Sequence, residues 1–193
     1  MLPGGHTPGS CSVLVYYMRI TGSREKTMTR KLSDGAIWLA IGFLSSYLVH
    51  LFPMFVGQVL LPLHFVVLLA GKLSGPAVGS TVGFALPLVT AITLGRPPLQ
   101  PPIALFMSAE LLCYGLIMGL MKEKNVYMAL VYSWIAGRVV FSFAVLVVGP
   151  MLGLQMDTFS SLMVSFALGI PGAMVQFLLI PTISKRVKLS QES

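Results

Sequence analysis

Long apolar segments with short polar or proline-rich connections constrain this chain more than any other feature. They extend from Gly35 to about Ile183, and hydrophobic residues make up 55% of the whole chain against 10% charged residues. A soluble fold of this composition would have too few polar residues to cover its surface. Because a helix needs about 20 mostly apolar residues to cross a membrane, this stretch has room for about six helices. We predict an all-α integral membrane protein, a six-transmembrane-helix bundle with helices at about 35–52, 55–73, 76–94, 102–121, 126–149 and 161–183.

Lysine and arginine residues fall mainly on one side of this predicted bundle. With the N-terminus inside, the outer connections carry only Arg96, while the inner segments carry Arg19, Arg24, Lys26, Arg30, Lys31, Lys72, Lys122, Lys124, Lys185, Arg186 and Lys188. Positive residues favour the cytoplasmic side, so both termini are predicted to be cytoplasmic. The chain then divides into a basic, partly disordered leader over 1–33, a six-helix membrane domain over 34–184 and a basic tail over 185–193.

Small residues and prolines predict two local features. Glycine recurs every four residues at positions 71, 75, 79 and 83, and again at 115 and 119. This spacing is typical of helices that pack closely, and we expect contacts within one chain in preference to oligomerisation. The stretch between the first two helices contains Pro53 and Gly57, and it is predicted to form a partly re-entrant loop.

The sequence gives no sign of an active site. Gly71-Lys72 resembles the end of a phosphate-binding loop, but the first glycine and the final Ser/Thr of that motif are missing. No GxSxG or HExxH pattern occurs, and Cys11 and Cys113 match no metal spacing. We predict no catalytic residues, no metal and no cofactor, and we expect that the chain does not hydrolyse ATP itself.

Two charged residues lie inside apolar segments, Glu110 in the fourth predicted helix and Arg138 in the fifth. A lone charge there costs at least about 2.5–3.5 kcal/mol, so both should point inward and have partners. Their similar predicted depth allows an ion pair between them. The alternative is that one or both line a cavity and bind a polar ligand. Tyr114, one turn from Glu110 on the same helix face, could join either arrangement.

Further polar residues are predicted near the outer ends of the helices. His64 follows Pro62 in the second predicted helix, and a neutral imidazole there suits a ligand site, although a histidine at a membrane interface is more often an anchor. His50 is a weaker candidate of the same kind. The outer loops add Gln58, Arg96 and Gln100 as recognition or lid residues. Gln176 lies deeper in the last helix, where an interhelical hydrogen bond is expected.

Several runs of the sequence together resemble one family. They are LPLHFVVLLAGKLSGPAVGSTVGFALPLVTAITLGRPPL at 61–99, MSAELLCYGLIMGL at 107–120, IAGRVV at 135–140 and GIPGAMVQFLLIP at 169–181. In order and spacing they resemble helices two to six of the substrate-binding S components of energy-coupling factor (ECF) vitamin transporters. Glu110, Tyr114 and Gly115 stand at family positions. The resemblance covers nearly everything after residue 34 and implies a location in the bacterial cytoplasmic membrane.

The first predicted helix contains AIWLA, from Ala36 to Ala40, which fits the AxxxA signature of that family. Two alanines four residues apart form a smooth stripe that a partner helix can approach closely. The resemblance implies that this stripe docks onto the transmembrane coupling subunit, which joins two ATPase subunits. It also implies that the chain captures its substrate from outside and topples in the membrane to deliver it.

The resemblance implies a vitamin or vitamin precursor as substrate. Pantothenate-type members are favoured, followed by cobalamin-, folate- and queuosine-type members, and the substrate-binding residues would be His64, Arg96, Glu110, Tyr114, Arg138 and Gln58. Two rival functions stay open. A membrane assembly or scaffold protein would use Glu110 and Arg138 only as a pair, and a stand-alone secondary transporter should show coupling carboxylates and inverted repeats that are not visible here.

Overall fold

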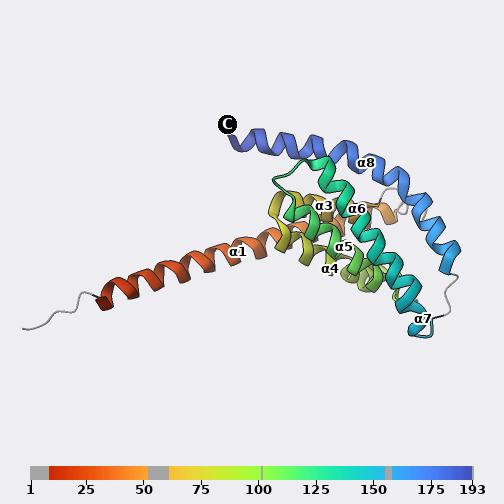
Figure 1. The fold of residues 1–193 in the computed structure, drawn as a ribbon, viewed down its shortest axis with the longest axis horizontal. Coiled ribbons are helices and arrows are strands. Elements are labelled where there is room, and N and C mark those ends of the chain that lie inside the picture. Colours follow the sequence, from red (N-terminus) through yellow and green to blue (C-terminus); the bar gives the residue numbers. More distant parts are fainter. Residues whose placement is uncertain (1–8, 52–60, 101, 155–157, 193) are drawn as a thin grey trace, which may run out of the picture.

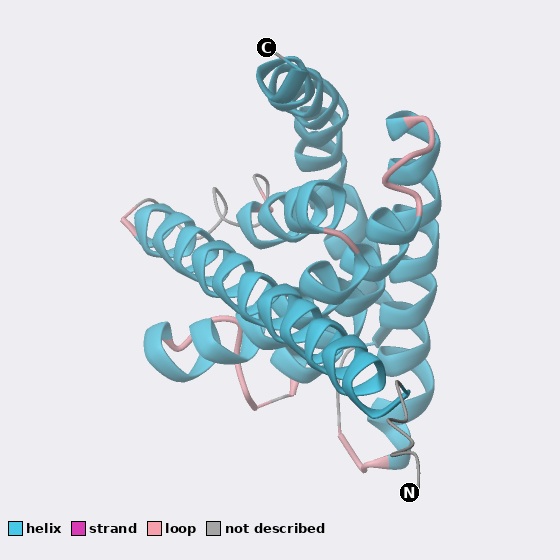
Figure 2. Ribbon diagram, turned by 90° about the vertical axis from the view of Figure 1, so that its left-hand side faces the viewer, coloured by secondary structure: helices cyan, strands magenta, loops and turns pink. Residues whose placement is uncertain are grey.

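The computed structural model describes residues 9–51, 61–100, 102–154 and 158–192, and the regular elements in these ranges are helices (Figures 1 and 2). In chain order they are α1 (Gly9–His50), α3 (Pro62–Ser74), α4 (Pro76–Leu94), α5 (Ile103–Leu120), α6 (Val126–Phe143), the π-helical η1 (Ala144–Val148), α7 (Gly149–Met151) and α8 (Thr158–Glu192). The all-α prediction is confirmed for these residues.

Within the described residues, four helical segments are long and apolar enough to cross a membrane: Thr27–Val49, Pro76–Leu94, Ile103–Leu120 and Val126–Met151. The last of these runs without a break through α6, η1 and α7, close to the predicted range 126–149. The predicted helix at 55–73 differs, because α3 has only 13 residues. At 1.5 Å per residue α3 measures about 20 Å, against a hydrocarbon thickness of about 30 Å. The predicted re-entrant loop falls at 53–60, outside the described residues.

The first helix differs most from the prediction, because α1 begins at Gly9 and so includes most of the segment expected to be a partly disordered leader. Residues 9–33 contain no proline, so nothing in them forces a helix to end. The N-terminal part of α1 projects away from the other helices (Figure 1). At the other end of the chain α8 continues to Glu192, so the predicted tail is helical as well.

Helix α5 packs against α3, α4 and α6, while α1 packs against α3 and α4, and α8 lies against α3 and α6. The contacts of α5 depend on glycine, since a Cβ at Gly71 or at Gly79 would lie 2.6 Å from the carbonyl oxygen of Gly115. Gly83 and Gly119 meet backbone atoms of the neighbouring helix in the same way. The predicted close packing within one chain is therefore confirmed for these glycines.

Gly75 plays another part, because it connects α3 and α4 with a φ of 91°, a backbone conformation that side chains rarely adopt.

One end of the bundle gathers basic residues from separate connections. The ammonium group of Lys72, in the last turn of α3, donates hydrogen bonds to the carbonyl oxygens of Lys122 (2.6 Å) and Lys124 (3.3 Å) between α5 and α6. Near the same end, the indole N–H of Trp38 in α1 donates to the hydroxyl of Ser74 at 2.9 Å. These contacts put the α3–α4 turn and the α5–α6 turn at the same end of the bundle, as an alternating helix order requires.

Candidate functional site

Three helices bring four polar or charged side chains together in the apolar interior. His64 comes from the first turns of α3, Glu110 and Tyr114 from α5, and Arg138 from α6. Glu110, His64 and Arg138 expose only 2%, 3% and 7% of their surface, and Tyr114 is fully buried. We call these four residues the polar cluster.

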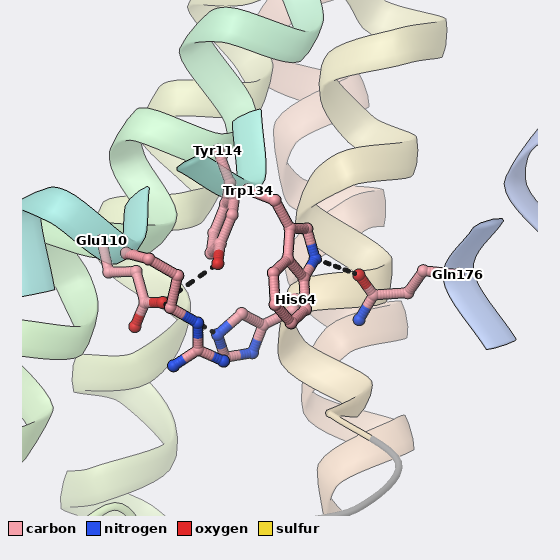
Figure 3. Close-up of polar contacts among 6 residues, drawn as sticks. His64, Glu110, Tyr114, Trp134 and Gln176 are labelled. Carbon is pink, nitrogen blue, oxygen red and sulfur yellow. Dashed lines mark hydrogen bonds and ion pairs between the residues drawn. The ribbon is translucent and has the colours of Figure 1, made fainter. Parts of the chain in front are cut away.

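The Glu110 carboxylate is the centre of the polar cluster. Its Oε1 accepts a hydrogen bond of 3.1 Å from the Tyr114 hydroxyl (Figure 3). The same oxygen lies 3.8 Å from Nε2 of His64 and 3.6 Å from Nε of Arg138. The predicted ion pair between Glu110 and Arg138 is thus confirmed. At 3.6 Å, Nε of Arg138 and Oε1 of Glu110 do not form a hydrogen bond. The predicted placement of Tyr114 beside Glu110 is confirmed too.

Helix spacing and one glycine explain how Tyr114 reaches this position. Residues four apart share a helix face, so the phenol of Tyr114 lies over Glu110. The ring also packs edge-on to His64, with 5.3 Å between ring centroids. On α6, a Cβ at Gly137 would come within 2.9 Å of the Tyr114 ring. Glycine at 137 therefore leaves room for the aromatic ring beside Arg138.

Aromatic rings and another glycine surround the guanidinium group of Arg138. Its Cζ lies 4.9 Å from the centroid of the Trp134 ring and 5.0 Å from that of Phe166. Such cation–π contacts stabilise a buried arginine, the more so where water is excluded. From α8, a Cβ at Gly169 would stand 2.8 Å from one terminal guanidinium nitrogen. The position of the group is thus restricted by both α6 and α8.

Trp134 also connects the polar cluster to Gln176. The indole N–H donates a hydrogen bond of 3.2 Å to Oε1 of Gln176, which is fully buried in α8 (Figure 3). The expected interhelical hydrogen bond of Gln176 is therefore confirmed. Because an indole N–H can only donate, the amide oxygen must face it, and the amide nitrogen points elsewhere.

Several buried polar atoms in and next to the polar cluster have no hydrogen-bond partner in the described part of the chain. They are both ring nitrogens of His64, Nε of Arg138, Nε2 of Gln176 and the hydroxyl of Ser133. A buried polar group without a partner costs about 1–3 kcal/mol, so a stable protein rarely keeps several in one place without a reason. Most of these atoms are donors, or can be.

The other predicted ligand-binding residues are not part of the described polar cluster. Arg96 and Gln100 are exposed in the connection between α4 and α5, and Gln58 falls outside the described residues. The structure therefore does not bring Arg96 to the other predicted ligand-binding residues. Ala36 and Ala40 are exposed on α1, where lipid or a partner helix can reach them.

Three residues of the site, Ser133, Trp134 and Phe166, were not predicted from the sequence. Trp134 precedes Arg138 by four positions, and this spacing alone could have identified it as a neighbour. Phe166 comes from α8, and no local pattern connects it to α6, so only the tertiary structure identifies it. Both aromatic residues were hidden among many other apolar residues.

The unpartnered nitrogens and hydroxyl can donate hydrogen bonds to acceptor atoms, and within the described residues no group of three or more His, Cys, Asp or Glu side chains is placed to hold a metal ion. Compared with protein-family models, with curated proteins and with solved structures, the chain matches none of them.

Proposed function

We propose that this chain is the substrate-binding S component of an ECF-type importer in a bacterial cytoplasmic membrane. It would capture a small water-soluble vitamin or precursor from outside, with a pantothenate-type substrate favoured over cobalamin-, folate- or queuosine-type substrates. The observation that carries this proposal is the group of buried polar atoms without partners between α3, α6 and α8. A ligand held there would supply the missing partners.

Energetics support a ligand site over a chance arrangement. Ionisable residues inside a membrane are expensive and usually functional. Besides Glu110 and Arg138, three other polar residues are buried in the same apolar environment: His64, Ser133 and Gln176. Apolar residues at these positions would remove the cost of burying polar groups. The presence of the five polar residues together therefore favours a binding role.

The length of α3 supports access from outside. If the Lys72 end of α3 lies at the inner surface, its 13 residues reach only about two thirds of the way across the hydrocarbon layer. The outer end, with His64 in its first turn, would then lie about 10 Å below the outer surface. This depth suits a vestibule through which a solute reaches the polar cluster. In this proposal α3 and α8 complete six spans, and both termini are cytoplasmic.

The proposed partners are an ECF transmembrane coupling subunit and two ATPase subunits. Ala36 and Ala40 would dock onto the coupling subunit, because both are exposed on the face of α1 that turns away from the bundle. The exposed side chains around them are large and apolar, among them Ile37 at 58% and Ile41 at 44% exposure, as expected for a face that meets lipid or another membrane helix.

The competing function is that of a membrane scaffold without a ligand, and the 3.6 Å approach of Arg138 to Glu110 favours it, since the two charges already compensate each other. Replacing both residues by Met distinguishes the two functions. A scaffold should tolerate the double change, because a buried ion pair can often be replaced by apolar residues. A binding subunit should fold but lose its ligand.

The experiment has two readouts on purified protein: native mass spectrometry for a retained small molecule, and thermal stabilisation by added vitamins. A matched control changes the exposed ion pair Lys122–Glu123, whose side chains are 3.8 Å apart, to Gln at both positions. We expect ligand binding in the wild type and in the control, and none in the Glu110→Met, Arg138→Met variant. Full ligand affinity in that variant would remove the polar cluster from the binding site.

A further inference from the structure

The unpartnered atoms around Arg138 also indicate what kind of ligand the site takes. Resting on the proposed function, we propose that the ligand carries a carboxylate, which Arg138 and His64 bind together, with the Gln176 amide as an additional donor.

The free groups around Arg138 are mainly donors. Nε of Arg138 can only donate, and it has no hydrogen-bond partner, although Oε1 of Glu110 lies 3.6 Å from it. The amide nitrogen of Gln176 can only donate as well, because the amide oxygen is occupied by Trp134. A histidine ring always offers at least one N–H, and neither ring nitrogen of His64 has a hydrogen-bond partner. A ligand that satisfies these three residues must therefore bring acceptor atoms.

Two aromatic rings and a glycine hold the guanidinium group of Arg138 while its Nε has no hydrogen-bond partner. The rings of Trp134 and Phe166 contact it, but they offer no acceptor oxygen. Gly169 leaves space beside a terminal nitrogen, where a Cβ would stand at 2.8 Å. An arginine held in this way is prepared to bind a planar anion with little loss of side-chain freedom, which suits a carboxylate.

The positions of the donors suit one carboxylate. Nε of Arg138 and Nε2 of His64 both lie within 4 Å of the same Glu110 oxygen, so they are near each other, yet they belong to different helices. A carboxylate has two oxygens and can accept about four hydrogen bonds, each about 2.7–2.9 Å long, so it can reach both donors at once.

Charge distinguishes a carboxylate from other ligands. A cationic group would face Arg138, and the one carboxylate in the described polar cluster, Glu110, already meets Arg138 and Tyr114. Glu110 repels any anion bound next to it, but a carboxylate brings one negative charge there and a phosphate up to about two, in a low-dielectric interior where repulsion is strong. A neutral carbonyl could accept the same hydrogen bonds, but hydrogen bonds from a charged donor to a charged acceptor are about twice as strong.

Matched pairs of small molecules test this assignment. The purified protein in detergent is heated with pantothenate or pantothenol, nicotinate or nicotinamide, biotin or biotinamide, and lipoate or lipoamide, and with cobalamin as a probe without a free carboxylate. We expect at least one acid to stabilise the protein, and its neutral counterpart to bind at least about tenfold more weakly.

Two variants test whether the preference for an acid over its neutral counterpart depends on Arg138. Arg138→Gln removes the charge, and Gly169→Ala displaces the guanidinium group while keeping its charge, so the second variant serves if the first fails to fold. Each should weaken binding of the acid at least about tenfold and leave binding of the neutral counterpart within a factor of about three. Arg186→Gln, which changes an exposed arginine of α8 outside the site, is the control and should change neither.

The outcomes separate this inference from the proposed function. Equal binding of an acid and its neutral counterpart, binding of cobalamin alone, or an acid affinity that survives both Arg138→Gln and Gly169→Ala would overturn the carboxylate assignment and leave a binding subunit standing. A retained molecule without a carboxylate, found by native mass spectrometry, would do the same. No binding to any probe, together with no retained molecule, would overturn both.

Discussion

Replacing Gly79 by alanine should destabilise the protein, although alanine is the better helix former. Gly79 lies inside α4, and its Cα faces the carbonyl group of Gly115 in α5. The added Cβ would stand 2.6 Å from that oxygen, where ordinary contacts begin at 3.4 Å. Backbone atoms cannot rotate away as a side chain can, so the two helices must separate locally.

The size of the effect follows from two opposing contributions. Overpacking of a well-packed interior costs about 1–3 kcal/mol, occasionally more. Alanine recovers up to about 1 kcal/mol through its higher helix propensity. The packing cost should win here by about 1–2 kcal/mol, because the obstacle is backbone and because α4 and α5 pack along most of their lengths. For a chain of this size, that corresponds to a decrease in melting temperature of about 2–8 °C.

The assay heats the detergent-purified protein and measures, at each temperature, the fraction that stays monodisperse. Gly35→Ala is a matched control, since a Cβ at Gly35 in α1 meets nothing within 4 Å. It should leave the melting temperature unchanged or raise it. Unfolding of Gly79→Ala at the wild-type temperature, or an equal loss of stability in Gly35→Ala, would show that the close approach of Gly79 to Gly115 does not limit the size of residue 79.

Three further predictions concern topology, assembly and the inner turns. A cysteine at exposed Gln100 should react with a membrane-impermeant thiol reagent added to intact cells, and a cysteine at exposed Glu123 should not; labelling at Glu123 would reverse the assigned orientation. Ala36→Leu combined with Ala40→Leu should bind ligand normally but fail to co-purify with a coupling subunit and fail to support uptake, and normal uptake would defeat the docking surface. Lys72→Met should lower the melting temperature by about 2–4 °C, because it removes the ammonium contacts to the α5–α6 turn at a cost of about 1 kcal/mol, and an unchanged value would show that those contacts add no stability.

The helical character of the fold could be predicted because its cause is local. A long apolar run with few charges has one favourable structure in a membrane, and the ranges expected for α4 and α5 agree with the structure to within a residue or two. The start of α1 could not be predicted in the same way. The polar composition of residues 9–33 suggests a leader, yet a chain without proline can continue an existing helix at little cost.

The polar cluster could be predicted in part, since charge inside an apolar helix is visible in the sequence. Glu110 and Arg138 stand out for this reason, and helix periodicity adds Tyr114. The environment of Arg138 was not predictable, because Phe166 and Gly169 approach it from α8 and nothing local connects these segments. Arg96 is a different case: a charged residue in a loop attracts attention, but its position depends on the path of the connection, which composition does not determine.

The way the polar cluster is divided among the helices has a consequence for motion. His64, Glu110 and Tyr114 belong to α3 and α5, which the glycine contacts join, together with α4, into one block whose helices cannot slide without first separating. Arg138, Trp134, Phe166 and Gln176 belong to α6 and α8, outside that block. The boundary between the two groups crosses the Glu110–Arg138 contact, where the two nearest atoms are held by charge alone. A movement of α6 and α8 away from α3 and α5 would therefore separate Arg138 from Glu110 and uncover the polar cluster, and it would also have to break the packing of α6 on α5.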